Sequence, residues 1–276
     1  MRRRHPPGVK ASAALTPRAG DNSFTSEMAQ HEHPPPPKPV PRPLPELVAH
    51  RGASRERPEN TLAAFAVALD HRAAGIELDV HATADGVVVV HHDPVPHGVY
   101  PDGRVERRPI AELRYVELST LRHAGEAIPS LRDVLALVGD RATVYVEIKG
   151  AGIERAVVDV VRASSARCAI HSFDHATIGR VRELAPEIPR GLLFDAGDTD
   201  TMLAEMAVRD ARDLWPQATL IDAAMVDAAH RAGKRIVAWT VDDRQLASYL
   251  AAIGVDALCT DDVPFIGGAL QGDAGR

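Results

Sequence analysis

Two short segments of the sequence carry charged side chains at a spacing of two residues. Residues 76–80 and 143–149 are rich in apolar and β-branched residues, which is typical of β-strands. Alternate side chains of a strand point to the same face, so Glu77 and Asp79 share one face of the first segment. Glu147 and Lys149 share one face of the second. Each pair alone could be a solvated strand face or an exposed pair on an edge strand, but the apolar flanks disfavour this interpretation.

Three carboxylates at such positions suggest a metal site. A charge that points into a packed interior is costly unless it is paired or bound to a metal. If Glu77, Asp79 and Glu147 converge on one face, they suit a hard divalent cation such as Mg²⁺, Ca²⁺ or Mn²⁺, because these ions prefer oxygen ligands.

His50 and His92 are candidates for acid/base catalysis. His50 ends the apolar run 47–50, and His92 follows the apolar run 87–90. Imidazole gives or takes a proton near neutral pH, so two histidines suit a reaction that needs two proton transfers. His91 would point away from His92 if the strand continued, so only one of the two should enter a site. The remaining histidines are interpreted as ordinary core or surface residues: His5, His31, His33, His71, His81, His97, His123, His171, His175 and His230.

The elements that must position these residues alternate between strands and helices. Strands are expected to start near residues 47, 76, 143, 167, 190, 213, 235 and 256, the sixth being weak. Helices are expected at 61–72, 131–138, 153–163, 175–184, 202–208, 223–231 and 244–253, with Asn60 and Ser130 as N-caps of the first two. This alternation indicates parallel βαβ units.

The pattern favours an α/β fold of the (β/α)8 TIM barrel type. Such a barrel takes about 250 residues and gathers the carboxyl ends of its strands on one face, where the polar residues above are placed. A doubly wound open sheet is also compatible with the periodicity. However, the turn after the first strand, Gly52 to Ser54, lacks the glycine-rich phosphate-binding pattern expected there.

A series of motifs in this order resembles the glycerophosphodiester phosphodiesterase family. The resemblance covers roughly residues 46–268. The matching segments are Val48–Gly52 (VAHRG), Pro58–Thr61 (PENT), Gly75–Val80 (GIELDV), Thr83–Gly86 (TADG), Val90–Asp93 (VHHD), Ile128–Leu131 (IPSL), Glu147–Lys149 (EIK), Ser172–Asp174 (SFD), Ala238–Val241 (AWTV) and Thr260–Asp261 (TD).

The resemblance implies a TIM barrel that hydrolyses glycerophosphodiesters to sn-glycerol 3-phosphate and an alcohol in a metal-dependent reaction. It implies that Glu77, Asp79 and Glu147 hold the divalent cation. His50 and His92 would be the acid/base pair, with His50 favoured as base and His92 as acid. Arg51 and Lys149 would contact phosphate, and Phe173 and Trp239 are expected to line the pocket wall or else to be core aromatics. Attack by water and attack by the substrate's own glycerol hydroxyl both remain open.

Two departures from the family pattern concern the substrate. The segment 94–98 (PVPHG) replaces the Arg-containing continuation common after His-Asp, so loop contacts to the substrate can differ. Asp242 occupies a position where Asn is common, and an acid there could repel an anionic head group or favour a cationic one such as choline or ethanolamine.

Two other functions compete with this prediction. A phospholipase-like phosphodiesterase acting on intact or lyso-phospholipids would need an apolar rim or an interfacial helix, and no segment is both basic and strongly amphipathic. A non-catalytic barrel that binds phosphorylated ligands is disfavoured because the two histidines and three carboxylates occur together.

The chain is expected to form a single domain with a disordered tail. Residues 1–45 are Pro-rich, have few large apolar side chains and carry a net charge of +4, so disorder or polyproline II is expected there. The barrel should span residues 46–270, and residues 271–276 form a C-terminal tail. The total charge of −6 leaves −10 for the rest of the chain, which disfavours nucleic acid as a partner.

Composition also restricts partners and location. Cys168 and Cys259 are expected to be buried free thiols rather than a disulfide. No apolar stretch approaches the roughly 18 residues of a membrane span, and no apolar region follows the basic start, so a cytoplasmic protein with no integral membrane contact is expected. The expected partner is a small-molecule glycerophosphodiester, and the oligomeric state is left open.

Overall fold

The computed structural model of the chain describes residues 43–273. The predicted disordered tail, apart from residues 43–45, lies outside the described residues, as does the second half of the predicted C-terminal tail, residues 274–276. Residues 271–273 are part of the last helix rather than of a tail.

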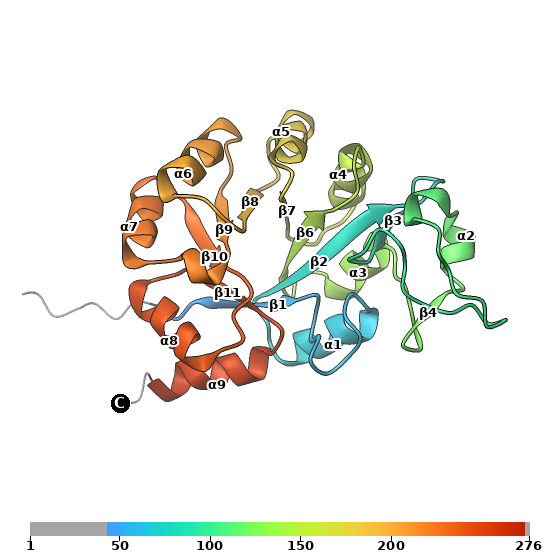
Figure 1. The fold of residues 1–276 in the computed structure, drawn as a ribbon, viewed down its shortest axis with the longest axis horizontal. Helices are drawn as coiled ribbons and strands as arrows, with labels where there is room; N and C mark the ends of the chain where they lie inside the picture. The colour runs from blue at the N-terminus through green and yellow to red at the C-terminus, as the bar shows by residue number, and fades with distance from the viewer. Residues whose placement is uncertain (1–42, 274–276) are drawn as a thin grey trace, which may run out of the picture. The chain divides into compact units, whose positions relative to one another are not determined.

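Eight parallel strands form a closed barrel (Figure 1). Each strand pairs with the next one along the barrel, and β1 pairs with both β11 and β2, which closes it. The strands are β1 (Glu46–His50), β2 (Gly75–Ala82), β6 (Thr143–Ile148), β7 (Cys168–Ser172), β8 (Arg190–Phe194), β9 (Asp213–Pro216), β10 (Arg235–Ala238) and β11 (Ala257–Thr260). The predicted TIM barrel is therefore confirmed, including its weak sixth strand, β9.

Helices cover the outside of the barrel (Figure 1). They are α1 (Leu62–Asp70), α3 (Leu131–Val138), α4 (Glu154–Arg162), α5 (His175–Leu184), α6 (Thr199–Val208), α7 (Ala223–Arg231), α8 (Arg244–Ile253) and α9 (Val263–Asp273). Ser130 caps α3 as predicted, since its hydroxyl accepts a hydrogen bond from the backbone of Asp133. The cap predicted for the first helix is wrong: Thr61 caps α1, and Asn60 donates its amide to Asp79 instead.

An insertion between β2 and α3 forms a small structure of its own. It contains β3 (Val88–Val90), which pairs antiparallel with the end of β2, the short helices η1 (Ile110–Glu112) and α2 (Tyr115–Leu118), and the hairpin of β4 (Arg122–His123) and β5 (Glu126–Ala127). It has a separate hydrophobic core of Val89, Tyr100, Ile110, Leu113, Leu118, Leu121 and Ile128. In Figure 1 this insertion, labelled at β3, α2 and β4, lies at one side of the barrel.

The barrel interior is apolar at one level and polar at the next. Its apolar layer consists of Val48, Tyr145, Ala169, Leu193, Trp215, Val237, Ala257 and Cys259. Because alternate residues of a strand share a face, the next inward positions after Val48, Tyr145 and Ala169 are His50, Glu147 and His171. The polar side chains therefore lie toward the carboxyl ends of the strands, above a packed floor.

The two cysteines differ in burial. Cys259 is a buried free thiol as predicted, whereas Cys168 is also free but only half-buried.

Among residues 43–273, no helix has the length and apolar character needed to cross a membrane.

Candidate active site

A pocket of about 100 Å³ opens at the carboxyl ends of the strands. It contains eight of the nine predicted site residues and four that were not predicted. The lining residues are His50, Arg51, Glu77, His92, Glu147, Lys149, His171, Phe173, Leu193, Trp215, Trp239 and Cys259. Residues from most of the barrel strands thus meet in one cavity, and Asp79 is the predicted residue that does not line it.

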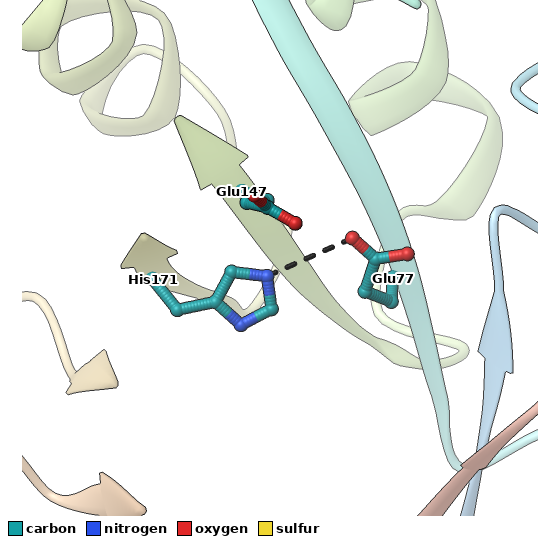
Figure 2. Close-up of side chains that lie close together, drawn as sticks. All are labelled: Glu77, Glu147 and His171. Atoms are coloured by element: carbon teal, nitrogen blue, oxygen red, sulfur yellow. Dashed lines mark ion pairs between the residues drawn. The ribbon is translucent and has the colours of Figure 1, made fainter. Parts of the chain in front are cut away.

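Glu77, Glu147 and His171 form a compact cluster in this pocket. Each offers one ligand atom, and these atoms lie within 4.8 Å of one another. Figure 2 shows the three side chains, from β2, β6 and β7, directed toward one another; Nε2 of His171 is 3.7 Å from Oε1 of Glu77. Both ring nitrogens of His171 are buried and lack a hydrogen-bond partner among the described residues. A buried polar atom without a partner costs about 1–3 kcal/mol, so this ring is suited to an additional ligand.

The electrostatics of the cluster also suit a cation. Burial, followed by the charge of Asp79, raises the pKa of Glu77 to about 7. Burial and Asp79 likewise raise the pKa of Glu147 to about 7, and burial lowers the pKa of His171 to about 4. A divalent cation would offset the repulsion between the carboxylates, and the two carboxylates supply the oxygen ligands that such ions prefer. The residues present therefore fit the predicted divalent metal.

Asp79 lies beside this cluster in a network of cationic partners. Its carboxylate is 3.2 Å from Nε of Arg51 and 3.7 Å from Nζ of Lys149, and it accepts a 2.9 Å hydrogen bond from Asn60. Burial acts to raise the pKa of Asp79, but Arg51 and Lys149 outweigh it, so the pKa is lowered. Asp79 pairs in register with Glu147 of β6, yet its predicted role as a metal ligand stays a prediction.

Each of the two predicted catalytic histidines is held by an aspartate. Nδ1 of His50 is 2.7 Å from Asp261, and Nδ1 of His92 is 2.7 Å from Asp93. This contact leaves Nε2 as the second functional nitrogen of each ring. Burial acts to lower the pKa of His50, but the hydrogen bond with Asp261 and the charge of Glu77 outweigh it and raise the pKa.

Arg51 and Lys149 lie between the histidines and the carboxylates. The backbone of Arg51 has a left-handed φ of 57°, and its N–H donates a 3.2 Å hydrogen bond to Glu77. Nη1 of Arg51 donates two hydrogen bonds, of 3.0 and 3.1 Å, to the two oxygens of Glu59. Nζ of Lys149 lies 3.1 Å from Glu147 and donates to Nε2 of His92 at 3.2 Å.

Two aromatic rings form one wall of the pocket. Phe173 and Trp239 meet edge to face with ring centroids 5.3 Å apart, and Nε1 of Trp239 donates to the carbonyl of Trp215. Phe173 is exposed, so it lies at the mouth. Asp242 does not line this pocket: it accepts hydrogen bonds from Thr260 and the backbone of Asp261.

Comparison with known proteins identifies the family. The family model described as the glycerophosphoryl diester phosphodiesterase family matches residues 50–264. The chain belongs to this family. It is 34% identical over 229 residues to a glycerophosphodiester phosphodiesterase of Caldanaerobacter subterraneus subsp. tengcongensis, which covers 78% of this chain and 93% of that protein.

Solved structures of glycerophosphodiester phosphodiesterases agree with the fold. A putative glycerophosphoryl diester phosphodiesterase from Silicibacter pomeroyi superposes with a TM-score of 0.77 at 27% identity, covering 86% of this chain and 95% of that one. A phosphodiesterase from Oleispira antarctica, in complex with the product sn-glycerol-3-phosphate, superposes with a TM-score of 0.75 at 27% identity, covering 83% of this chain and 97% of that one. The predicted enzyme class, a phosphoric diester hydrolase of the glycerophosphodiester phosphodiesterase type, is confirmed.

The structure adds three residues that the sequence analysis of this family member did not assign. His171 was interpreted as an ordinary core or surface residue, and this is corrected: it lines the pocket and joins the candidate metal cluster. Asp93 and Asp261 orient His92 and His50. Strand alternation carried a signal for His171, because it follows the inward Ala169 by two residues and pairs in register with Glu147.

Proposed function

We propose that the chain hydrolyses glycerophosphodiesters to sn-glycerol 3-phosphate and an alcohol, using His50 and His92 as its acid/base pair. The observation that carries this proposal is the shared arrangement of the two histidines. Each is held at Nδ1 by an aspartate, and each lines the same pocket as the buried Glu77 and Glu147. Two oriented imidazoles at one cavity are what a reaction with two proton transfers requires.

The hydrogen bonds favour a division of roles opposite to the one expected from the sequence. Nζ of Lys149 can only donate, so its 3.2 Å contact places Nε2 of His92 in the role of acceptor, which is the role of a base. His50 lies between Asp261 at 2.7 Å and Glu77 at 4.0 Å, and two carboxylates favour its protonated form. We therefore assign His92 as the base and His50 as the acid.

The remaining charged residues would bind the phosphate and the cation. Arg51 and Lys149 supply cationic donors for the non-bridging phosphate oxygens. Glu77, Glu147 and His171 would hold the divalent cation, together with Asp79 as predicted from the sequence. When bound, such an ion polarises a phosphoryl oxygen and offsets developing negative charge. The Phe173 and Trp239 wall would enclose the organic part of the substrate.

Glycerophosphocholine is a suitable first substrate, with released sn-glycerol 3-phosphate as the readout. We expect release that stops after chelation and resumes with Mg²⁺, Ca²⁺ or Mn²⁺. Lysophosphatidylcholine in a parallel assay distinguishes the phospholipase-like alternative, which would prefer it. Full activity after exhaustive chelation would refute the metal requirement, and no release from any glycerophosphodiester would refute the proposed function.

A further inference from the structure

Three histidines of the insertion lie together outside the catalytic pocket. The ring centroids of His91, His97 and His123 are separated by 5.8, 6.1 and 6.2 Å. None of the three lines the pocket that contains His92. The reaction proposed above uses none of them.

The backbone of the insertion holds these residues in place. The N–H of His91 donates to the carbonyl of Asp79 on β2. Val99 and Arg122 exchange two backbone hydrogen bonds of 2.9 and 3.0 Å, which brings the segment after His97 alongside β4. This approach requires a glycine at position 98, because a Cβ there would lie 2.8 Å from the carbonyl oxygen of Arg122.

His123 is presented by a tight hairpin. It ends β4, and the following Ala124 and Gly125 have positive φ values of 48° and 89°, which are typical of a two-residue hairpin turn. Among residues 43–273, neither ring nitrogen of His123 has a hydrogen-bond partner. His91 is buried and His97 is exposed, so the cluster is open to solvent on one side.

The hydrogen bond of His97 matches that of a metal-binding histidine. Nε2 of His97 contacts the carboxylate of Asp93, which leaves Nδ1 for a ligand. A histidine that binds a metal almost always donates its other N–H to a carboxylate or carbonyl in this way. Nε2 of His91 accepts a long, 3.3 Å bond from the backbone N–H of His97, and a bound ion would replace this N–H as the partner of that nitrogen.

The charge state of His91 agrees with this role. Burial, followed by the neighbouring His123 and His97, lowers its pKa to about 4, so it is neutral at physiological pH. Neutral imidazole is the form that binds metals.

We propose that His91, His97 and His123 form a second cation site, selective for a borderline transition-metal ion such as Zn²⁺. Imidazole ligands suit Zn²⁺, Cu²⁺ and Ni²⁺, whereas the carboxylate-rich catalytic cluster suits harder ions. Rings that share a tetrahedral Zn²⁺, with Zn–N bonds of about 2.0–2.1 Å, have centroids roughly 5 Å apart. The cluster would therefore contract by about 1 Å through side-chain rotation when the ion binds.

Calorimetric titration of the full chain with Zn²⁺ tests this site. His31 and His33 are first replaced by Asn in every sample, because two histidines one residue apart can themselves bind Zn²⁺, and saturating Mg²⁺ is added to occupy the catalytic cluster. We expect one Zn²⁺ per chain, and His123→Asn should weaken its binding by at least about tenfold. His97→Asn should do the same, and His230→Asn on α7 should bind as the parent does. Visible absorption of Co²⁺ in place of Zn²⁺ should be lost in the same two variants.

Three results would overturn the proposal. The first is a parent chain that binds no Zn²⁺ under these conditions. The second is unchanged Zn²⁺ binding in both His123→Asn and His97→Asn, each verified as folded by its unfolding temperature. The third is loss of Zn²⁺ binding in Glu147→Gln but not in His123→Asn, which would place the ion in the catalytic cluster.

Discussion

At the scale of single residues, His50 and His92 each contact one aspartate and a different third group. His50 lies near the carboxylate of Glu77, whereas His92 lies near the ammonium group of Lys149. This difference in surroundings is the basis of the opposite roles proposed for the two side chains. Their roles can be separated by varying the leaving group.

Replacing either His50 or His92 with Ala should lower kcat on an alkyl diester by about 10²–10⁴-fold, the usual contribution of a general acid or base. The p-nitrophenolate group of a p-nitrophenyl diester leaves without protonation. His50→Ala should therefore recover activity on this substrate, and His92→Ala should not. His230→Ala serves as the control for loss of a histidine elsewhere. Recovery of His92→Ala alone would reverse the roles, and near-normal turnover of both variants on an alkyl diester would exclude the pair.

The candidate metal ligands His171 and Asp79 make a second residue-level prediction. His171→Gln removes a buried imidazole from the cluster, so we expect the cation dissociation constant measured by calorimetry to increase by about tenfold or more. Asp79→Asn is measured in parallel, with the unfolding temperature as the check on folding. If His171→Gln binds the cation normally and Asp79→Asn does not, the ligands are Glu77, Asp79 and Glu147, and His171 belongs to the pocket wall.

At the scale of elements, one buried carboxylate joins several residues of the insertion. Glu106 accepts hydrogen bonds from Tyr100, from the side chain and backbone of Arg108, and from the backbone of Arg107. These contacts lie beside the separate core of the insertion, which includes Tyr100. The hydrogen bond from Arg108 lowers the pKa of Glu106. Burial opposes this effect and the hydrogen bond from Tyr100 adds to it, so the pKa is lowered overall.

This lowered pKa predicts how the stability of the protein depends on pH. A carboxyl group with a depressed pKa in the folded state stabilises that state above its unfolded pKa, about 4.3, and the stabilisation is lost as the pH falls further. Glu106→Gln should therefore reduce the free energy of unfolding by about 1–3 kcal/mol at pH 7. The difference from the parent, measured by calorimetry, should shrink below about pH 4.

The exposed Glu112 of the same insertion provides the matched control. Glu112→Gln should change the unfolding temperature little at either pH. A Glu106→Gln variant whose deficit is equal at both pH values would show that the charge of Glu106 does not stabilise the fold.

At the scale of the whole molecule, barrel closure gathers the site from distant parts of the chain. His50 on β1 meets Asp261 after β11, 211 residues away, and Glu77 meets Glu147 and His171 from the next two barrel strands. Because an ion at this cluster would join three strands, its binding should stabilise the whole domain.

A cation that binds only the folded state stabilises it by about 2.7 kcal/mol at 100 times its dissociation constant. For a domain of this size, this corresponds to a rise in unfolding temperature of roughly 5–10 °C. Scanning calorimetry with chelator and with Mg²⁺, Ca²⁺ or Mn²⁺ measures this rise in unfolding temperature. Glu147→Gln should lose the response, and an unchanged unfolding temperature of the parent with every ion would contradict the metal site.

The sequence by itself determined the barrel and most of the site. Short apolar runs mark most of the strands, because buried parallel strands need such residues on both faces, whereas the strand at 213–216 (DLWP) gives only a weak signal. Alternation placed Glu77 and Asp79 on one face of their strand, and chain order placed His50, His92 and Lys149 near strand ends. These are local properties of the backbone, so they can be predicted without knowing which strands are neighbours.

The tertiary structure decided the contacts between segments. Asp79 contacts Arg51 and Lys149. Asn60 donates to Asp79, and Thr61 caps α1. His171 lies beside Glu77. The tertiary structure also brought together His91, His97 and His123, which the sequence separates by up to 32 positions. The reason is physical: partners of a buried polar group are set by strand register and loop packing, and neither is encoded in the spacing of residues within one segment.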